Sequence, residues 1–374
     1  MDNYVNETSS DDETFGSTEA SRVALGPLGD ALLQFSHWYQ GIHGYVSIAV
    51  CLFGIASNLT NIVVLTRKSM ITPTNHLLTA LAIADVMTMV SYLPYATYFY
   101  CLTVPDESYG HPKAWVIYLL FNVYFTITTH TIAMWLTVSL AIFRYIVVCH
   151  HTLGTRLCNL RRARLTVAAV FLATPIVCIP NYITYHLEQR KDNGYWFTNT
   201  YFVTRSYTAL NLALFSVVMK VVPCVLLTVL STLLIRAMRA ADAKRKRLKS
   251  QGKKDEHTER AVENARTTAM LVAVVLCFVM AELPQGILAF LSGVDEQLFY
   301  LIYVPLGDVW DILGLLNSAV NFVLYCTMSR QFRTTFVYVF CPCRRPLKKT
   351  RTSSRNSRHP LHPTSAAHAR PDNL

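Results

Sequence analysis

Long apolar stretches alternate with polar connections along the chain. Seven of them are each long enough to cross a membrane, since a helix needs roughly 20 apolar residues to span a hydrocarbon core about 30 Å thick. They occupy residues 41–66, 74–98, 114–149, 165–185, 207–235, 267–291 and 298–328. This pattern predicts an all-α membrane protein built as a bundle of seven transmembrane helices.

The third stretch is the longest. Residues 114–143 contain no Asp, Glu, Lys or Arg. As a helix they extend about 45 Å at 1.5 Å per residue, which exceeds a hydrocarbon thickness of about 30 Å. We therefore expect this helix to cross at a tilt or to project from the bilayer.

The two ends of the chain differ from the bundle, which we assign to residues 39–328. Residues 1–38 carry seven acidic residues against Arg22 alone, which predicts a disordered, acidic extracellular tail. Residues 329–341 place aromatic side chains at i, i+4 and i+8 beside arginines, the pattern of a short amphipathic helix on the membrane surface. Residues 342–374 are basic and rich in Ser, Thr, Pro and His, which predicts a disordered cytoplasmic tail.

Both tails contain candidate modification sites. Asn6-Glu7-Thr8 matches the acceptor pattern for glycosylation. Cys341 and Cys343 follow the amphipathic helix in a basic context, which predicts palmitoylation, with two unmodified cysteines as the alternative.

The composition excludes an ordinary soluble protein, because 52% of the residues are hydrophobic and only 15% are charged. A net charge of +11 would suit a nucleic acid, but the basic residues gather in alternate connections and in the carboxyl tail. That asymmetry places the amino end outside and the carboxyl end inside. We therefore expect a multi-pass protein of the plasma membrane whose surroundings are the lipid bilayer, and no nucleic acid partner.

Few residues offer catalytic chemistry. His150 and His151 lack metal-ligand spacing with any other His or Cys, and no phosphate-binding loop or nucleophile setting appears. We expect neither an enzyme nor a metal centre.

Only Cys101 of the ten cysteines falls near the predicted outer face, so we expect no disulfide on that face. Asp85 is the only carboxylate in the second stretch, and an ionisable group within lipid needs a polar cavity or a partner.

Three motifs carry a resemblance to a known family. Arg144-Tyr145 lies near the inner end of the third stretch, residues 321–325 read Asn-Phe-Val-Leu-Tyr, and residues 281–286 read Ala-Glu-Leu-Pro-Gln-Gly. Over residues 42–336 the chain resembles rhodopsin-like G protein-coupled receptors. The glutamate before the proline, followed by Gln-Gly, resembles the invertebrate myosuppressin and FMRFamide-type neuropeptide receptors, with the sex-peptide and myoinhibitory-peptide receptors as close kin.

The resemblance implies an activation core that couples to a heterotrimeric G protein, formed by Arg144, Tyr145, Asn321 and Tyr325. It also implies a polar cluster that can bind Na⁺, formed by Asp85, Asn58, Asn317 and Ser318. Ala133 stands where a serine ligand of the ion is usual. No other cofactor is expected.

The sequence departs from the family pattern at the inner side. Phe143 replaces the acidic residue that normally holds Arg144, Phe322 replaces a proline, and Ser231 replaces a tyrosine. One hypothesis is that Arg144 is loosely restrained and basal signalling is raised. The alternative is that packing by Phe143 restrains the helix equally well.

Peptides of the FMRFamide type end in Arg-Phe-amide, so the resemblance implies a counter-ion for the guanidinium group and an apolar slot for the phenylalanine. The polar candidates are Asp311, Asp308, Glu282, Gln285 and His130. The aromatic candidates are Tyr95, Tyr98, Trp115 and Phe290.

Two of these polar residues have an alternative structural role. Glu282 could form an internal ion pair with Lys220, which would leave Asp308 and Asp311, about one turn apart, as the peptide contacts. His130 could be a hydrogen-bonded core histidine. The family also commonly lacks the disulfide between the third span and the second outer loop, and here Leu119 fills the third-span position.

We therefore expect a receptor for a short amidated neuropeptide, FMRFamide-like or myosuppressin-like, that signals through a heterotrimeric G protein. Arrestin and a receptor kinase are the further cytoplasmic partners that we expect. One alternative is a receptor for a myoinhibitory-type peptide without a terminal Arg-Phe. Another is a signalling-deficient decoy that binds peptide, which the departures at Phe143, Ser231 and Phe322 motivate.

Overall fold

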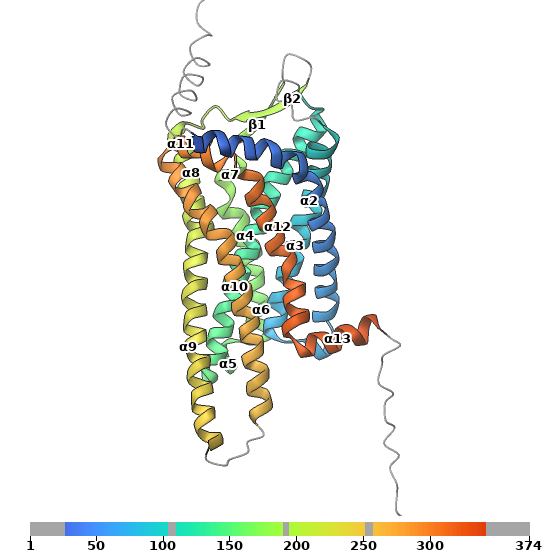
Figure 1. Cartoon of the computed structure of the whole chain (residues 1–374), viewed down its shortest axis with the longest axis vertical. Helices are drawn as coiled ribbons and strands as arrows, with labels where there is room; N and C mark the ends of the chain where they lie inside the picture. The colour runs from blue at the N-terminus through green and yellow to red at the C-terminus, as the bar shows by residue number, and fades with distance from the viewer. Residues whose placement is uncertain (1–26, 104–109, 190–193, 251–256, 342–374) are drawn as a thin grey trace, which may run out of the picture.

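The computed structural model describes residues 27–103, 110–189, 194–250 and 257–341, and its long helices form one elongated bundle (Figure 1). The first four spans are α2 (Pro27–Leu65), α3 (Pro73–Ala96), α4 (Lys113–Cys149) and α6 (Leu160–Val177). The fifth consists of α8 (Arg205–Ser216), η3 (Val217–Val221) and α9 (Val222–Ser250), the sixth is α10 (His257–Val294), and the seventh is α12 (Gly307–Met328). The amphipathic helix α13 (Arg330–Phe340) follows.

Short elements connect the spans. At the end of the bundle next to α13, which we call the inner end, they are η1 (Lys68–Met70) and α5 (His151–Leu157). At the opposite end, which we call the outer end, they are η2 (Thr97–Leu102), α7 (Ile179–Tyr182), the antiparallel hairpin of β1 (Tyr185–Gln189) and β2 (Tyr195–Asn199), α11 (Glu296–Leu298) and η4 (Phe299–Tyr303). The segments η2, η3 and η4 are π-helical turns, which are frequent at functional sites.

All seven predicted stretches contain a helical span, which confirms the predicted fold class. The predicted fourth stretch was too long, because α6 ends at Val177 and β1 begins at Tyr185. Between them Pro180 begins the separate helix α7, since its ring fits the first turn of a helix but cannot continue one. The predicted extensions of the fifth and sixth spans, at the inner end, are helical to Ser250 and from His257.

The predicted boundary of the acidic tail at residue 38 is wrong, because α2 begins at Pro27. Proline suits the first position of a helix, and Asp30 in the first turn interacts favourably with the helix dipole. The first part of α2, dark blue in Figure 1, lies across one end of the bundle before the helix turns along the bundle axis. Residues 1–26, with Asn6, and residues 342–374, with Cys343, lie outside the described residues.

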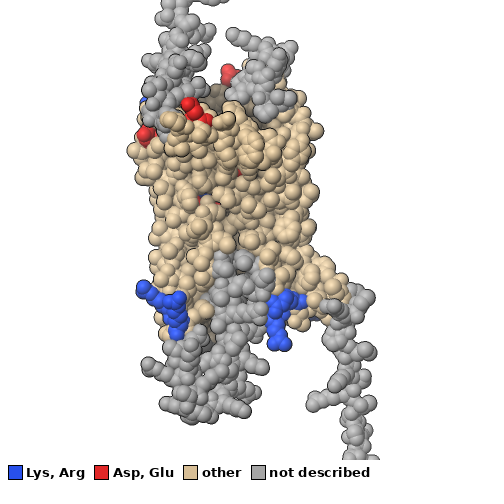
Figure 2. Space-filling view, in the orientation of Figure 1, with Lys and Arg blue, Asp and Glu red and all other residues tan. Residues whose placement is uncertain are grey.

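The outer surface of the bundle suits a membrane. Five helical segments of the described residues are long and apolar enough to cross one: 27–65, 73–102, 113–149, 205–240 and 275–294. On the face shown in Figure 2, Lys and Arg lie near the lower end and Asp and Glu near the upper end, with a broad band of other residues between them. This distribution matches the asymmetry that the sequence predicts.

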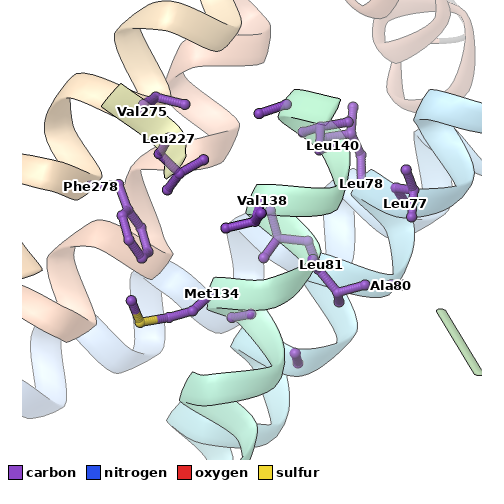
Figure 3. Packing of buried hydrophobic residues seen from close by; sticks show 14 of the residues in the cluster. Leu77, Leu78, Ala80, Leu81, Met134, Val138, Leu140, Leu227, Val275 and Phe278 are labelled. Atoms are coloured by element: carbon purple, nitrogen blue, oxygen red, sulfur yellow. The ribbon is translucent and has the colours of Figure 1, made fainter. Parts of the chain in front are cut away.

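The largest buried cluster joins α3, α4, α9 and α10 in the inner half of the bundle (Figure 3). Leu81, Met134, Val138, Leu227 and Phe278 interdigitate there, each 5% exposed or less. A second buried cluster joins α2, α3 and α12 and includes Met89, Tyr92 and Ile312. These two clusters pack the helices against one another and so fix the polar side chains that they carry.

Candidate functional site

A buried ion pair lies between the fifth and sixth spans. Lys220 Nζ is 2.7 Å from Glu282 Oε2 and donates a hydrogen bond to Gln285 Oε1 at 2.6 Å. His130 Nε2 of α4 lies 3.1 Å from the other carboxylate oxygen of Glu282. Because both oxygens of Glu282 have protein partners and its side chain is only 2% exposed, this carboxylate is internally compensated.

The local backbone explains how Lys220 reaches its partners. Lys220 lies in the π-helical turn η3, which aims the side chain into the bundle instead of toward lipid. Gly286 of α10 faces this turn, and a Cβ atom there would lie only 2.8 Å from Lys220 Cβ. The absence of a side chain at Gly286 therefore permits the close approach of α10 and η3 that the ion pair requires.

The carboxylates of the seventh span have a different environment. Asp311 Oδ2 accepts a hydrogen bond from the Tyr92 hydroxyl at 3.0 Å, and Asp308 Oδ1 accepts one from the Tyr100 hydroxyl at 2.6 Å. Neither aspartate forms an ion pair with a residue that the structure describes. Asp311 is surface-accessible although its partner Tyr92 is buried. The outer half of the bundle thus presents two carboxylates one turn apart without a cationic partner among the described side chains.

Aromatic rings surround these two aspartates. Tyr95 lies 5.2 Å from Tyr92 and 5.8 Å from Tyr100 between ring centroids, in edge-to-face arrangements. His43 of α2 contacts Tyr100 at 4.7 Å between centroids, and its Nε2 is 3.0 Å from the Tyr92 hydroxyl. We call Tyr92, Tyr95, Tyr100, Asp308 and Asp311 the acidic–aromatic cluster.

Our sequence analysis missed Tyr92, Tyr100 and His43. The signal that could have found the tyrosines is their spacing, because Tyr92 and Tyr95 share one helix face with the start of η2. His43 could have been noticed as a histidine inside an apolar stretch.

The other predicted aromatic residues do not join this cluster. Tyr98 stacks on Trp115 with a centroid distance of 3.8 Å and an interplanar angle of 7°, at the side of the bundle where η2 meets α4. Phe290 is 39% exposed and makes no ring contact with a described residue. The structure therefore divides the predicted aromatic wall between two places and leaves Phe290 out of both.

A separate polar cluster lies deeper in the bundle around Asp85, which is 2% exposed. Asn321 Nδ2 donates a hydrogen bond to Asp85 Oδ2 at 3.1 Å. Asn58 Nδ2 joins α2 to α12 by donating to the carbonyl oxygen of Ser318 at 3.0 Å. Asp85, Asn317, Ser318 and Asn321 line a small cavity together with Leu81, His130, Ala133, Thr137 and Phe278.

The inner end carries the predicted activation residues. Arg144 and Tyr145 lie in the last turns of α4, and the Tyr145 ring lies 5.8 Å from His150. Phe143 is partly buried against the large apolar cluster. Tyr325 lies in α12, but its side chain is outside the described part of the structure. Cys341 is exposed directly after α13.

Comparisons with known proteins agree with this architecture. The family model described as "Serpentine type 7TM GPCR chemoreceptor Srw" matches residues 45–343. The G-protein coupled receptor dmsr-1 of Caenorhabditis elegans is 30% identical over 89% of this chain and 74% of that protein. The sex peptide receptor of Drosophila melanogaster is 31% identical over 80% of this chain and 72% of that receptor.

A more distant relative is the FMRFamide receptor of Drosophila melanogaster, which is 24% identical over 78% of this chain and 52% of that protein. These relatives are receptors and not enzymes. With a matching family model over most of the bundle and two relatives at or above 30% identity, the chain belongs to the seven-transmembrane G protein-coupled receptor family.

Proposed function

We propose that this receptor recognises a short amidated neuropeptide of the FMRFamide or myosuppressin type through a cationic side chain near the peptide's carboxyl end. The observation that carries the proposal is the accessible carboxylate of Asp311, which has a tyrosine but no cation as a partner among the described residues. Asp308 adds a second carboxylate one turn away. A peptide arginine is the complementary group, because its planar guanidinium can bind carboxylate oxygens through two parallel hydrogen bonds.

The ion pair of Lys220 and Glu282 supports this assignment by elimination. A guanidinium that bound Glu282 would have to compete with an ammonium at 2.7 Å and would leave Lys220 buried without its partner. Binding of the guanidinium to Asp311 displaces no cation of the described residues. We therefore assign Lys220, Glu282, Gln285 and His130 to the floor of the ligand site and the acidic–aromatic cluster to its charged wall.

The rings of the acidic–aromatic cluster suit the phenylalanine that follows arginine in such peptides, since edge-to-face aromatic contacts favour this pairing. The names of two relatives support a peptide as the ligand, since the sex peptide receptor and the FMRFamide receptor are named for peptides.

Binding at the outer end would favour an inner-open conformation through its higher affinity for that conformation. The charge distribution in Figure 2 supports an amino end outside, and a receptor for an extracellular peptide would lie in the plasma membrane. The G protein would then meet the end that carries Arg144, and arrestin and a receptor kinase would meet the same end and the serines of the carboxyl tail.

We also propose Na⁺ for the cavity beside Asp85. The oxygen atoms present fit a small cation, because Asn321 Oδ1 is buried and accepts no hydrogen bond from a described residue. The cavity has about the space of one water molecule. Bound Na⁺ would offset the charge of Asp85, although Ala133 offers no side-chain oxygen to the ion.

Replacing external Na⁺ by N-methylglucamine should change peptide affinity in the native receptor but not in Asp85→Asn. An equal change of affinity in both receptors would oppose the sodium proposal.

The central experiment measures G protein activation in cells that express the chain and receive a panel of amidated peptides. We expect Arg-Phe-amide peptides to activate the native receptor. Asp311→Asn should lower potency at least about tenfold, since a hydrogen bond to a charged group contributes about 1.5–3 kcal/mol. The matched control is Asp295→Asn, a change of an exposed carboxylate on the same side of the molecule.

Each other outcome has a defined meaning. Activation only by peptides without a terminal Arg-Phe would contradict the charge assignment and favour a myoinhibitory-type ligand. Binding of labelled peptide without nucleotide exchange would favour the decoy. Equal potency of Asp311→Asn and native receptor would remove Asp311 from the site.

A further inference from the structure

The outer hairpin is attached to the bundle without a disulfide. The cysteines among the described residues are free thiols, and none lies in β1 or β2. Leu119 is buried in α4 near this end of the bundle. Some other contact must therefore hold the hairpin in place, and it is found where the segment before α4 meets β2.

The contact is a short piece of antiparallel backbone pairing. His111 N donates to Tyr195 O at 3.0 Å, and Tyr195 N donates to His111 O at 2.9 Å. Next to this pair two glycines touch each other. A Cβ atom on Gly110 would lie 2.5 Å from Gly194 Cα, and one on Gly194 would lie 2.3 Å from Gly110 Cα. Because the opposing atoms are backbone, no side chain of any size fits at either position without moving the strands apart.

Side chains reinforce the pairing. The His111 ring stacks on Trp196 with a centroid distance of 5.3 Å and an interplanar angle of 30°. Lys113 Nζ lies 5.5 Å from the centre of the Tyr195 ring, a cation–π geometry. Burial lowers the pKa of His111, so its ring is neutral at physiological pH and does not repel Lys113. We call Gly110, His111, Gly194, Tyr195 and Trp196 the glycine clasp.

The clasp connects to the acidic–aromatic cluster through a continuous series of ring contacts. From Tyr92, the hydrogen-bond donor to Asp311, the series runs to Tyr95 at 5.2 Å, to Phe99 at 5.4 Å and to His111 at 5.1 Å. At the α4 side, the Tyr124 hydroxyl donates a hydrogen bond to the carbonyl oxygen of Tyr185 in β1. The hairpin thus contacts α4 and, through His111, the series of rings that leads to Tyr92, at the end of the bundle seen in Figure 1.

We propose that Gly110 and Gly194 are positioning residues for the ligand site: their contact fixes the hairpin beside the series of rings that leads to Tyr92 and Asp311, as a wall of that site, without a covalent link. The inference rests on the proposed function for its affinity readout, but the clasp itself can be observed without ligand. Since no covalent bond is involved, the position of the hairpin is independent of thiol reductants.

The test compares Gly110→Ala and Gly194→Ala with Gly41→Ala, because a Cβ at Gly41 meets no atom within 4 Å. Labelled-peptide binding at the cell surface separates two effects. A defect of folding lowers the number of sites per surface receptor, whereas a displaced hairpin raises Kd. We expect each clasp variant to raise Kd at least about tenfold with the number of sites unchanged, which corresponds to a loss of about 1.4 kcal/mol in binding free energy.

A second variant supplies the contact covalently. Residues that exchange both backbone hydrogen bonds have Cα atoms about 5.5 Å apart, a separation that a disulfide can bridge. We expect His111→Cys/Tyr195→Cys to keep native Kd when oxidised and to lose affinity in dithiothreitol, while the native receptor is unaffected by the reductant. Dependence of the native receptor on reductant would contradict the proposal, and so would native Kd in both alanine variants.

A ligand-free measurement separates this inference from the proposed function. In hydrogen exchange, the amides of His111 and Tyr195 should be protected in the native receptor and in Gly41→Ala, and unprotected in Gly194→Ala. If the amides behave in this way but no peptide binds the native receptor, the peptide proposal has failed and the clasp stands. If the amides exchange freely in the native receptor, the clasp is absent and the inference fails.

Discussion

The charge of Lys220 and that of Glu282 stabilise the bundle only as a pair. Removing one partner of a buried ion pair costs about 3–5 kcal/mol because the other charge remains buried. We expect Lys220→Met and Glu282→Gln each to lower the melting temperature of the detergent-solubilised receptor. The melting temperature of the double variant should fall by less than the sum of the two single decreases, since the double variant leaves neither charge unpaired.

The control is Glu188→Gln, a change of an exposed glutamate in β1. Strict additivity of the two single losses would show that the side chains do not interact in the folded receptor.

The ion pair of Lys220 and Glu282 could be predicted because both residues are charged and both lie in apolar stretches. The spacing of the tyrosines could have marked them as a group, but it could not show that Tyr100 is the one that reaches Asp308, since that depends on the π-helical turn η2, which no local sequence pattern specifies.

At the level of elements, the docking of α13 on α12 depends on Phe322. Its ring lies 6.1 Å from Phe332 and 5.9 Å from Phe336, and Phe332 is 2% exposed. An aromatic pair contributes about 0.5–1.5 kcal/mol beyond its area. We therefore expect Phe322→Ala to loosen α13 and to speed its backbone hydrogen exchange several-fold. Leu316→Ala, a change of a residue that is 46% exposed on the same helix, should leave the exchange of α13 unchanged.

The helix α13 itself was predictable. Its aromatic positions repeat at i, i+4 and i+8, and the predicted residues 329–341 agree with the observed Arg330–Phe340. The Ser329 side chain caps its first turn by accepting from Phe332 N at 3.2 Å. The hairpin was not predicted, because β1 and β2 are only five residues each and are fixed by backbone contact with Gly110 and His111, which are distant in sequence.

At the level of the whole molecule, apolar length and the distribution of charge predicted the seven spans and the two ends of the bundle. Apolar length and charge distribution are sums over many residues, so a misjudged single position changes the prediction little. The beginning of α2 was misplaced because residues 27–38 were grouped with the acids that precede them. Those residues lie across the end of the bundle, which depends on tertiary contacts instead of local composition.

Signalling links the two ends of the molecule, and Phe143 gives a test of how the inner end is restrained. Phe143 packs on the large apolar cluster, and its carbonyl oxygen accepts a hydrogen bond from Cys158 Sγ at 3.7 Å. Losing about 1 kcal/mol of this packing would shift a two-state equilibrium about fivefold. We expect Phe143→Ala to raise ligand-free nucleotide exchange by that factor at equal surface expression, while Phe143→Leu and the exposed neighbour change Ile142→Ala stay at the native rate. A native rate in Phe143→Ala would mean that packing at this position does not hold the inactive state, and would leave the loose restraint of Arg144 as the better hypothesis.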